Sequence, residues 1–352
     1  MKSCSYIKFK FLHINIKFIQ EAYEAIHGKT NNLGDISKID VKDIPEHDLF
    51  TYSFPCTDIS VAGKMLGLSK GSGTRSGLLW ECQRIIEHCK PKYLLMENVK
   101  NLVGKKFKTE FDSWEAWLKK QGYSNYWKVL NAKDYNIPQN RERVFMVSVL
   151  GEHKKYEFPK EFPLKTSIKD ILEENIPEKC YLSDVLLNKF IPNETYILNK
   201  IGKKFDISKI EAGFIQKGEN GKKHQSNTVM NADYISRSLT AGDYKAPPMV
   251  LLEDKLFCEL RCDEGIRLYN NNICGTICAK SYGGKKAILE MTPTFKIRRL
   301  TSTECFRLMG MDDRDIQLIK EAGISASQQY KMAGNSIAIP VLEEIFKNLF
   351  LK

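Results

Sequence analysis

The sequence predicts an α/β fold in which a mostly parallel β-sheet carries helices on both faces, together with a smaller irregular domain. From about residue 40 to residue 150, short apolar runs alternate with helix-like stretches, which is typical of strands joined by crossover helices. After Gly151 this alternation stops, and helical periodicity returns near Thr301. We therefore expect one domain over residues 1–154, a second over 155–292, and a segment over 293–352 that completes the first.

The first predicted elements follow from the spacing of apolar residues. Residues 47–54 (HDLFTYSF) predict a strand that ends at Pro55, and residues 91–97 (PKYLLME) predict the next strand. Between them, residues 77–89 (GLLWECQRIIEHC) repeat apolar side chains on one face of a helix.

The next helix and two strands complete the first domain. Residues 112–123 (DSWEAWLKKQGY) predict a helix that closes at Gly122, because glycine is common just after a helix C-terminus. Residues 126–132 (YWKVLNA) and 143–150 (RVFMVSVL) are apolar runs of strand length.

The C-terminal segment is predicted to be helical. Residues 302–311 (STECFRLMGM) have helical periodicity, and residues 338–351 form an amphipathic pattern that begins after Gly334 and Asn335.

Composition narrows the class of protein. The chain has 352 residues, a formal net charge of +11 and 42% hydrophobic residues, which describes a folded chain with a basic balance that favours a polyanionic partner. No run approaches the roughly 18 uninterrupted apolar residues of a membrane-spanning helix. The ten cysteines are irregularly spaced, and the sequence shows no signal peptide, which is typical of a protein in a reducing compartment. We therefore expect a cytoplasmic protein that does not enter a membrane.

Two motifs place reactive groups where predicted strands end. In residues 53–60 (SFPCTDIS) an apolar strand runs directly into Pro55 and Cys56, and strand ends are where α/β proteins place their sites. Taken alone, Cys56 is also explained as a buried thiol. Glu97 and Asn98 end the next strand, where an acidic residue can equally be a helix N-cap.

A third motif adds positive charge. Residues 136–145 (NIPQNRERVF) contain Gln139, Arg141 and Arg143 before a strand, and arginines two positions apart share one strand face. Surface charge alone would explain this motif, but the three motifs together bring a thiol, a carboxylate and two guanidinium groups to one sheet edge. Structural need does not explain that combination.

In this order, the motifs resemble those of the cytosine-C5 DNA methyltransferases of bacterial and phage restriction-modification systems. The family's Pro-Cys, Glu-Asn-Val, Gln-x-Arg-x-Arg and Gly-Asn-Ser motifs are here Pro55-Cys56, Glu97-Asn98-Val99, Gln139-Asn140-Arg141-Glu142-Arg143 and Gly334-Asn335-Ser336. Residues 299–311 (RLTSTECFRLMGM) match the penultimate block of the family. The resemblance covers about residues 20–352 except the variable middle, and it implies the Rossmann-like fold of S-adenosylmethionine-dependent methyltransferases.

The resemblance implies an enzyme that methylates C5 of a cytosine flipped out of the DNA duplex. Cys56 would add to C6 as a thiolate and thereby make C5 nucleophilic. Glu97 would act as a hydrogen-bonding acid at N3, and Arg143 near O2 would stabilise the charge that develops. Arg141 would orient the thiolate and lower its pKa.

The implied cofactor is S-adenosylmethionine. Asp35 matches the acidic residue that the family places near the adenine amino group, although it could equally be a turn residue. The resemblance implies further cofactor contacts from Pro55, Leu78, Asn335 and Ser336.

Double-stranded DNA is the implied partner of a monomeric protein, and a restriction endonuclease acting on the same site is a second candidate partner. Residues 155–292 would be the target-recognition domain, which contacts bases in the major groove. The expected DNA contacts are Ser60, Gln139, Thr240 and Arg299. RNA-acting relatives share two of the motifs, but the long middle region favours DNA.

One family motif is missing from the sequence. The Phe-x-Gly-x-Gly loop that approaches the cofactor has no counterpart, because no glycine precedes Gly28. Residues 21–28 (EAYEAIHG) resemble the helix that follows the second strand of the family. Either the N-terminal residues rebuild the cofactor site, or the chain is an impaired methyltransferase that binds DNA without methyl transfer.

A metal site is not predicted. Four cysteines repeat a Cys-x3-Cys spacing, which differs from the two-residue gap usual in zinc knuckles; they are Cys258, Cys262, Cys274 and Cys278.

Overall fold

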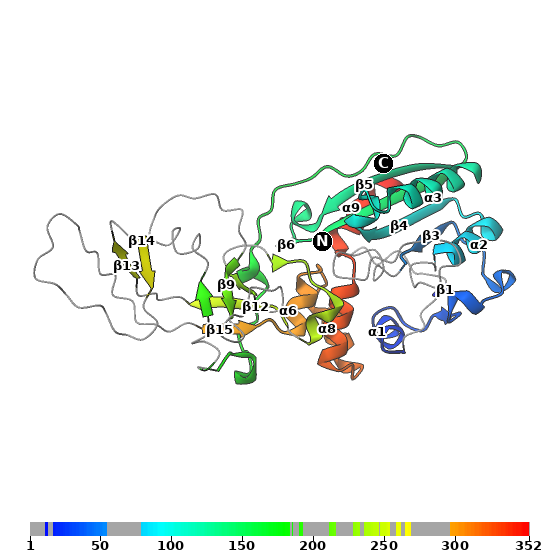
Figure 1. Ribbon diagram of the computed structural model, residues 1–352. Helices are drawn as coiled ribbons and strands as arrows, with labels where there is room; N and C mark the ends of the chain where they lie inside the picture. Colours follow the sequence, from blue (N-terminus) through cyan, green and yellow to red (C-terminus); the bar gives the residue numbers. More distant parts are fainter. Residues whose placement is uncertain are drawn as a thin grey trace, which may run out of the picture.

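Among the residues that it describes, the computed structural model has a four-stranded sheet, a five-stranded sheet, three two-stranded pairs and a group of helices (Figure 1). The residues that it describes are 11–12, 17–54, 79–183, 185, 190–192, 211–215, 228–232, 236–245, 247–253, 258–261, 265–268 and 296–351.

The main sheet has the strand order β3-β4-β7-β5. Its strands are β3 (Leu49–Tyr52), β4 (Tyr93–Val99), β5 (Tyr123–Asn131) and β7 (Glu142–Leu150). β3 pairs with β4 in parallel, whereas β7 is antiparallel to both β4 and β5. Three of these four strands run in one direction, but only one of the three pairings is parallel, so the sheet is mixed. The α/β class is confirmed, whereas the sheet is less parallel than the sequence predicts.

Helices α2 (Leu79–Cys89) and α3 (Lys108–Lys120) cover one face of this sheet (Figure 1). Met96 of β4 and Met146 of β7 are fully buried in the core beneath these helices. α3 packs into the same core through Trp114, as the apolar periodicity of its sequence requires.

The opposite face packs against the C-terminal helix α9 (Ile339–Phe350). Leu95 and Val147 belong to this second core because neighbouring side chains of a strand point to opposite faces. Ile345 is the fully buried contribution of α9. The sheet therefore carries helices on both faces, as the sequence predicts.

Four further helices contribute buried side chains to this second core. They are α1 (Lys17–His27), α6 (Ser302–Arg307), α7 (Asp313–Glu321) and α8 (Ala326–Asn335). α1 lies beside α7, and α6 lies beside α8. The predicted helix over 302–311 is shorter in the structure because the chain turns at Gly310, where φ is +78°.

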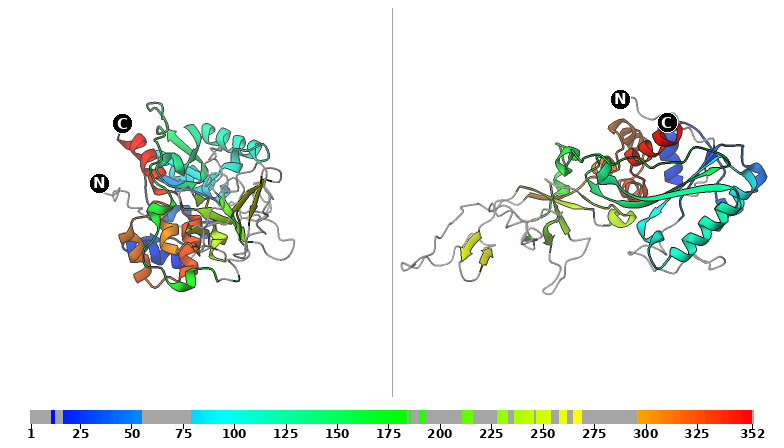
Figure 2. Two further views of the ribbon diagram at one scale, coloured as in Figure 1. Left: turned by 90° about the vertical axis from the view of Figure 1, so that its left-hand side faces the viewer. Right: turned by 90° about the horizontal axis from the view of Figure 1, so that it is seen from above.

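A second sheet, of order β15-β12-β10-β9-β8, lies to the side of the main sheet (Figures 1 and 2). Its strands are β8 (Phe190–Pro192), β9 (Glu211–Ile215), β10 (Thr228–Asn231), β12 (Met249–Glu253) and β15 (Lys296–Arg299). β13 (Cys258–Arg261) and β14 (Gly265–Leu268) form an antiparallel pair farther out. Cys258 begins β13, whereas the other three cysteines of the repeated spacing lie outside the described residues.

Two short strand pairs and several single 3-10 turns connect these parts. The paired strands are β1 (Phe11–Leu12) with β2 (Asn31–Asn32), and β6 (Gln139–Asn140) with β11 (Ser236–Arg237). The 3-10 helices are η1 (Ile36–Lys38), η2 (Val41–Asp43), η5 (Lys100–Val103), η6 (Ala132–Tyr135), η7 (Ile168–Ile171), η8 (Glu178–Cys180) and η10 (Ala241–Tyr244). Among the described helices, none has the length and apolar character needed to cross a bilayer.

Candidate active site

Glu97 forms a buried ion pair at the C-terminal end of β4. Its Oε1 lies 3.2 Å from Nε of Arg143, and its Oε2 accepts a 3.1 Å hydrogen bond from the hydroxyl of Ser53. The antiparallel register explains the pair, because Val99 of β4 lies opposite Arg143 and Glu97 is two residues away on the same face. Glu97 is only 9% exposed.

The environment of Glu97 favours its protonated form more than water does. Burial raises the pKa of the Glu97 carboxyl, and the nearby charges of Arg143 and Arg141 oppose that rise without reversing it. A buried carboxyl with a raised pKa at a sheet edge is suited to donate a hydrogen bond or a proton.

Asn98 attaches the end of β4 to the residue that precedes the Pro-Cys motif. Its Nδ2 donates a 3.0 Å hydrogen bond to the carbonyl of Phe54, and its Oδ1 accepts one of 2.9 Å from the Val99 amide. Asn98 is 1% exposed. Phe54 is thereby fixed beside Glu97, and the sequence places Cys56 two residues further on. Four predicted site residues lie outside the described residues: Pro55, Cys56, Ser60 and Leu78.

Arg141 joins two segments that are distant in the sequence. One terminal nitrogen donates to the carbonyl of Leu239 at 2.8 Å and to the hydroxyl of Ser238 at 3.2 Å. The other donates to the carbonyls of Ser336 at 2.7 Å and Gly334 at 3.1 Å. These four hydrogen bonds fix a loop of the middle region to the end of α8, a function that the sequence did not indicate for Arg141.

Gln139 is fully buried beside Arg141, which differs from the expectation that it contacts DNA. Its Nε2 donates to the carbonyl of Leu308 at 2.8 Å, and its Oε1 accepts from the amide of Leu239 at 3.2 Å. The residue has 0% exposure, so in this conformation its amide joins protein segments and presents no surface to a ligand.

The loop of residues 236–244 places Thr240, a predicted DNA contact, against α8. The Thr240 side chain is partly exposed. A Cβ atom on Gly334 would come within 2.2 Å of the Thr240 carbonyl carbon and oxygen, so glycine is required for this close approach. Arg299, another predicted DNA contact, is the partly exposed last residue of β15.

Asp35 caps the turn η1. Its carboxylate accepts hydrogen bonds from the Ser37 amide at 3.1 Å and the Ser37 hydroxyl at 2.8 Å. These hydrogen bonds lower the pKa of the Asp35 carboxyl. The sequence allowed Asp35 to be a cofactor contact or a turn residue, and in the structure it stabilises a turn.

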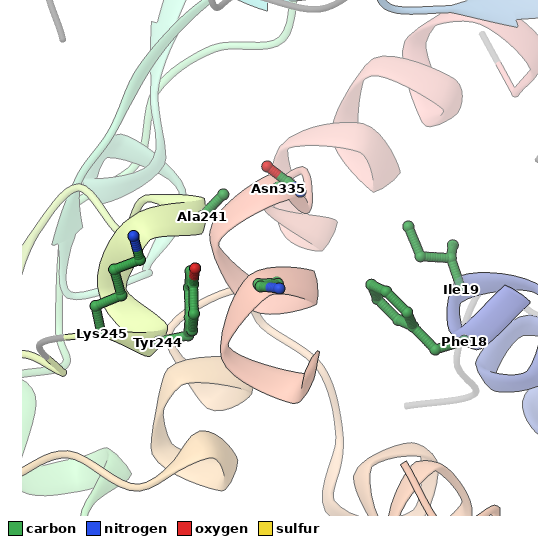
Figure 3. Close-up of a pocket in the computed structure, with 7 residues that line it drawn as sticks. Phe18, Ile19, Ala241, Tyr244, Lys245 and Asn335 are labelled. Atoms are coloured by element: carbon green, nitrogen blue, oxygen red, sulfur yellow. The ribbon is translucent and has the colours of Figure 1, made fainter. Parts of the chain in front are cut away.

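A pocket of about 440 Å³ lies between α1, η10 and α8 (Figure 3). The ring of Tyr244 has the ammonium group of Lys331 4.3 Å from its centre. Asn335, a predicted cofactor contact, lines this pocket, whereas Ser336 is the C-cap of α8. The full lining is Phe18, Ile19, Ala241, Tyr244, Lys245, Lys331 and Asn335.

Sequence reasoning missed three residues of this region. Ser53 hydrogen-bonds Glu97, and Arg237 forms an ion pair with Asp243 beside Thr240. The Thr-x-x-Asp spacing of residues 240–243 resembles a capping box and could have indicated Asp243. No comparable local signal identifies Ser53 or Arg237.

Comparisons with known proteins agree with this fold. The family model described as "C-5 cytosine-specific DNA methylase" matches residues 7–351. The type II methyltransferase M2.ScrFI of Lactococcus lactis subsp. cremoris is 39% identical over 91% of this chain and 71% of its own length. The orphan methyltransferase M.SssI of Spiroplasma monobiae is 31% identical over 95% of this chain and 73% of its own length.

The solved structure of the S. pombe Dnmt2 methyltransferase shares the fold, with a TM-score of 0.61 and 19% identity over 98% of this chain and 91% of that chain. The fold and the ordered motifs define an α/β DNA methyltransferase. The chain belongs to the C-5 cytosine-specific DNA methylase family.

Proposed function

We propose that this protein transfers a methyl group from S-adenosylmethionine to C5 of cytosine in duplex DNA, through a covalent bond between Cys56 and C6 of the base. The observation that carries the proposal is the buried Glu97 carboxyl, with its raised pKa, paired with Arg143 and tied through Asn98 to the chain that leads into Cys56.

The Cys56 step explains why these groups are needed together. Its thiolate forms a bond to C6, and the electron pair of the C5–C6 double bond shifts so that C5 becomes nucleophilic. Negative charge develops on N3 and O2 during this addition. A protonated Glu97 would donate a hydrogen bond to N3, which is the form that burial favours.

Arg143 supports the same step in two ways. Its Nε contacts Glu97, and its guanidinium would add positive charge near O2, where the ring becomes negative. After C5 has been methylated, loss of the C5 proton and departure of the thiolate restore the aromatic ring and regenerate Cys56.

The pocket at α8 has the size and chemistry for the methyl donor. Its volume of about 440 Å³ lies within the range of small-molecule sites. The aromatic and apolar side chains of Phe18 and Ile19 suit an adenine ring, and Lys331 suits the carboxylate of the methionine moiety. Asn335 would contact the cofactor there, which when bound supplies an electrophilic methyl group.

Asp35, Pro55, Leu78 and Ser336 remain predicted cofactor contacts on the strength of the resemblance alone.

We assign different functions to the main sheet and the second sheet. Residues 1–154 and 293–352 would form the catalytic domain, because they contribute the main sheet, its covering helices and Glu97. Residues 155–292 would be the target-recognition domain, because they contribute most of the second sheet and the outer strand pair. Ser60, Thr240 and Arg299 would contact the DNA bound between them.

The partner is duplex DNA in this proposal, and the chain acts as a monomer. A restriction endonuclease that cleaves the same sequence is a further expected partner, since the relative M2.ScrFI is named a type II methyltransferase.

Covalent trapping tests the proposal directly. The substrate is a mixed-sequence duplex in which 5-fluorocytosine replaces cytosine. Because this base carries fluorine instead of hydrogen at C5, no proton can be lost there, and the bond between Cys56 and C6 should persist after methyl transfer. We expect the wild-type protein to give a denaturant-stable protein–DNA adduct that requires S-adenosylmethionine, and a peptide carrying the adduct at Cys56.

The control is Cys56→Ser, checked for an unchanged thermal transition and unchanged DNA binding. An adduct that persists in Cys56→Ser would contradict the assignment of Cys56. Absence of any adduct from folded, DNA-bound wild-type protein would instead favour the impaired methyltransferase that binds DNA without methyl transfer.

A further inference from the structure

We propose that Arg237 and Asp243 are positioning residues, whose ion pair fixes the loop of residues 236–244 so that the Thr240 hydroxyl is presented to a phosphate of the bound DNA. The inference rests on the proposed function, because Thr240 is there a DNA contact. It goes beyond that function because it assigns two residues that the ordered motifs do not include.

The ion pair between Arg237 and Asp243 is bidentate. One terminal nitrogen of Arg237 lies 2.7 Å from Oδ1 of Asp243, and the other donates to Oδ2 at 3.2 Å. Asp243 is only 7% exposed, so water screens the pair weakly. A fork-shaped guanidinium and a planar carboxylate fix each other's orientation as well as their distance.

Asp243 also fixes the peptide group of Thr240. Its Oδ2 accepts a 2.7 Å hydrogen bond from the Thr240 amide, and its own amide donates to the Thr240 carbonyl at 3.1 Å. The Thr240 hydroxyl has no hydrogen-bond partner within the described part of the chain. It can therefore donate to an anionic phosphate oxygen, the kind of contact that sets the register of a protein on DNA.

Other contacts prevent the loop from moving as a whole. Ser236 and Arg237 of β11 pair with β6, and the Arg141 guanidinium binds the Leu239 carbonyl. On its far side the Thr240 backbone contacts Gly334 too closely for any side chain there. Since both flanks are fixed, loss of the ion pair should change the local orientation of Thr240 without releasing the loop.

The experiment measures methyl transfer to an unmethylated mixed-sequence duplex, with kcat and the KM values for DNA and S-adenosylmethionine determined separately. For Asp243→Asn we expect the KM for DNA to rise about tenfold, with kcat and the cofactor KM changed by less than about twofold. Arg237→Lys keeps the charge but loses the fork geometry, so its effect should be smaller.

Arg307 and Asp313 provide a matched control. They form another bidentate pair across the same six-residue spacing, at 2.8 Å for both contacts, but between α6 and α7. Asp313→Asn should leave the KM for DNA unchanged. An equal rise in that variant would overturn the proposal, because the effect would then follow from the loss of any such pair.

A double-mutant cycle with Thr240→Val, which removes only the hydroxyl, separates positioning from general stability. If Asp243 acts through that hydroxyl, Asp243→Asn should add little to the KM of Thr240→Val. If the double variant instead raises the KM for DNA by the product of the two single increases, the proposal is overturned. If Asp243→Asn does not fold, Arg237→Lys takes its place in the cycle.

The test also distinguishes failure of the proposed function from failure of this inference. If the wild type transfers no methyl group, the catalytic proposal fails. The double-mutant cycle is then repeated with the Kd for the duplex, measured by fluorescence anisotropy, in place of the KM. Non-additive Kd values would then support the positioning function. A wild type that does not bind the duplex would overturn it.

Discussion

At the scale of single residues, the site depends on groups whose burial changes their chemistry. Glu97 would be an ordinary carboxylate in water, but burial beside Ser53 and Arg143 shifts it toward the acid form. Asn98 has no chemical step of its own and instead fixes the backbone at Phe54. Of these two consecutive residues of β4, Glu97 therefore supplies the acidic group, and Asn98 holds the backbone that leads into Cys56.

The raised pKa of Glu97 predicts a specific pH dependence of stability. Since the folded state binds the Glu97 proton more tightly than the unfolded state, this proton stabilises the fold below the unfolded pKa of about 4.3. That stability is lost as the pH rises through the folded pKa. In urea titrations across this window, the wild type should lose stability relative to Glu97→Gln, and a relative gain would contradict the assignment.

Gly334 gives a residue-scale prediction in which two physical effects oppose each other. Helix propensity favours alanine over glycine by about 1 kcal/mol. The new Cβ, however, would lie 2.2 Å from the Thr240 carbonyl, and such overpacking typically costs about 1–3 kcal/mol. We expect urea unfolding to show Gly334→Ala as destabilised. The neighbouring exposed residue provides a control, since Asn335→Ala should change the unfolding free energy by less than about 0.5 kcal/mol.

At the scale of elements, α8 is the helix on which several contacts converge. Its last turn and its C-cap supply the carbonyls bound by Arg141, its surface packs on η10, and Lys331 and Asn335 line the pocket. The helix has only ten residues, so its termini contribute a large share of its stability.

The N-terminus of α8 provides a test of this dependence. Ser325 and Gln328 form a capping box in which the Gln328 side chain accepts from the Ser325 amide at 3.1 Å. Ser325→Ala should cost about 1 kcal/mol of unfolding free energy. Ser327→Ala removes a neighbouring hydroxyl whose one hydrogen bond within the described part of the chain is to the Ser325 hydroxyl, so it should cost less. Equal losses in chemical denaturation would contradict the capping argument.

At the scale of the whole molecule, the sequence predicts much of the α/β part. The strands at 47–54 and 91–97 and the helix closing at Gly122 form where their periodicity indicates, with Gly122 at φ +95°. The reversed direction of β7 was not predictable, because apolar periodicity is the same for parallel and antiparallel strands. The helix α3 begins earlier than expected, at Lys108 rather than residue 112.

The site was predictable where both residues lie at the same end of neighbouring strands, and not where the partner lies in another segment of the chain. Motif order brought Glu97 and Arg143 together correctly, as the ion pair shows. Arg141, in contrast, contacts Leu239 and Ser336, which are 98 and 195 positions away, and no local pattern specifies such partners. Gln139 is buried for the same reason, since its amide bonds to residues 100 and 169 positions away.

The central claim is that this chain methylates C5 of cytosine in duplex DNA. The most direct measurement incubates unmethylated duplex DNA with the purified protein and S-adenosylmethionine, digests the DNA to nucleosides and identifies the methylated product by mass spectrometry. We predict 5-methyl-2′-deoxycytidine from the wild type and none from Cys56→Ser or from reactions without the cofactor. Methylation at another position, or no methylated nucleoside from folded protein that binds the DNA, would contradict the claim.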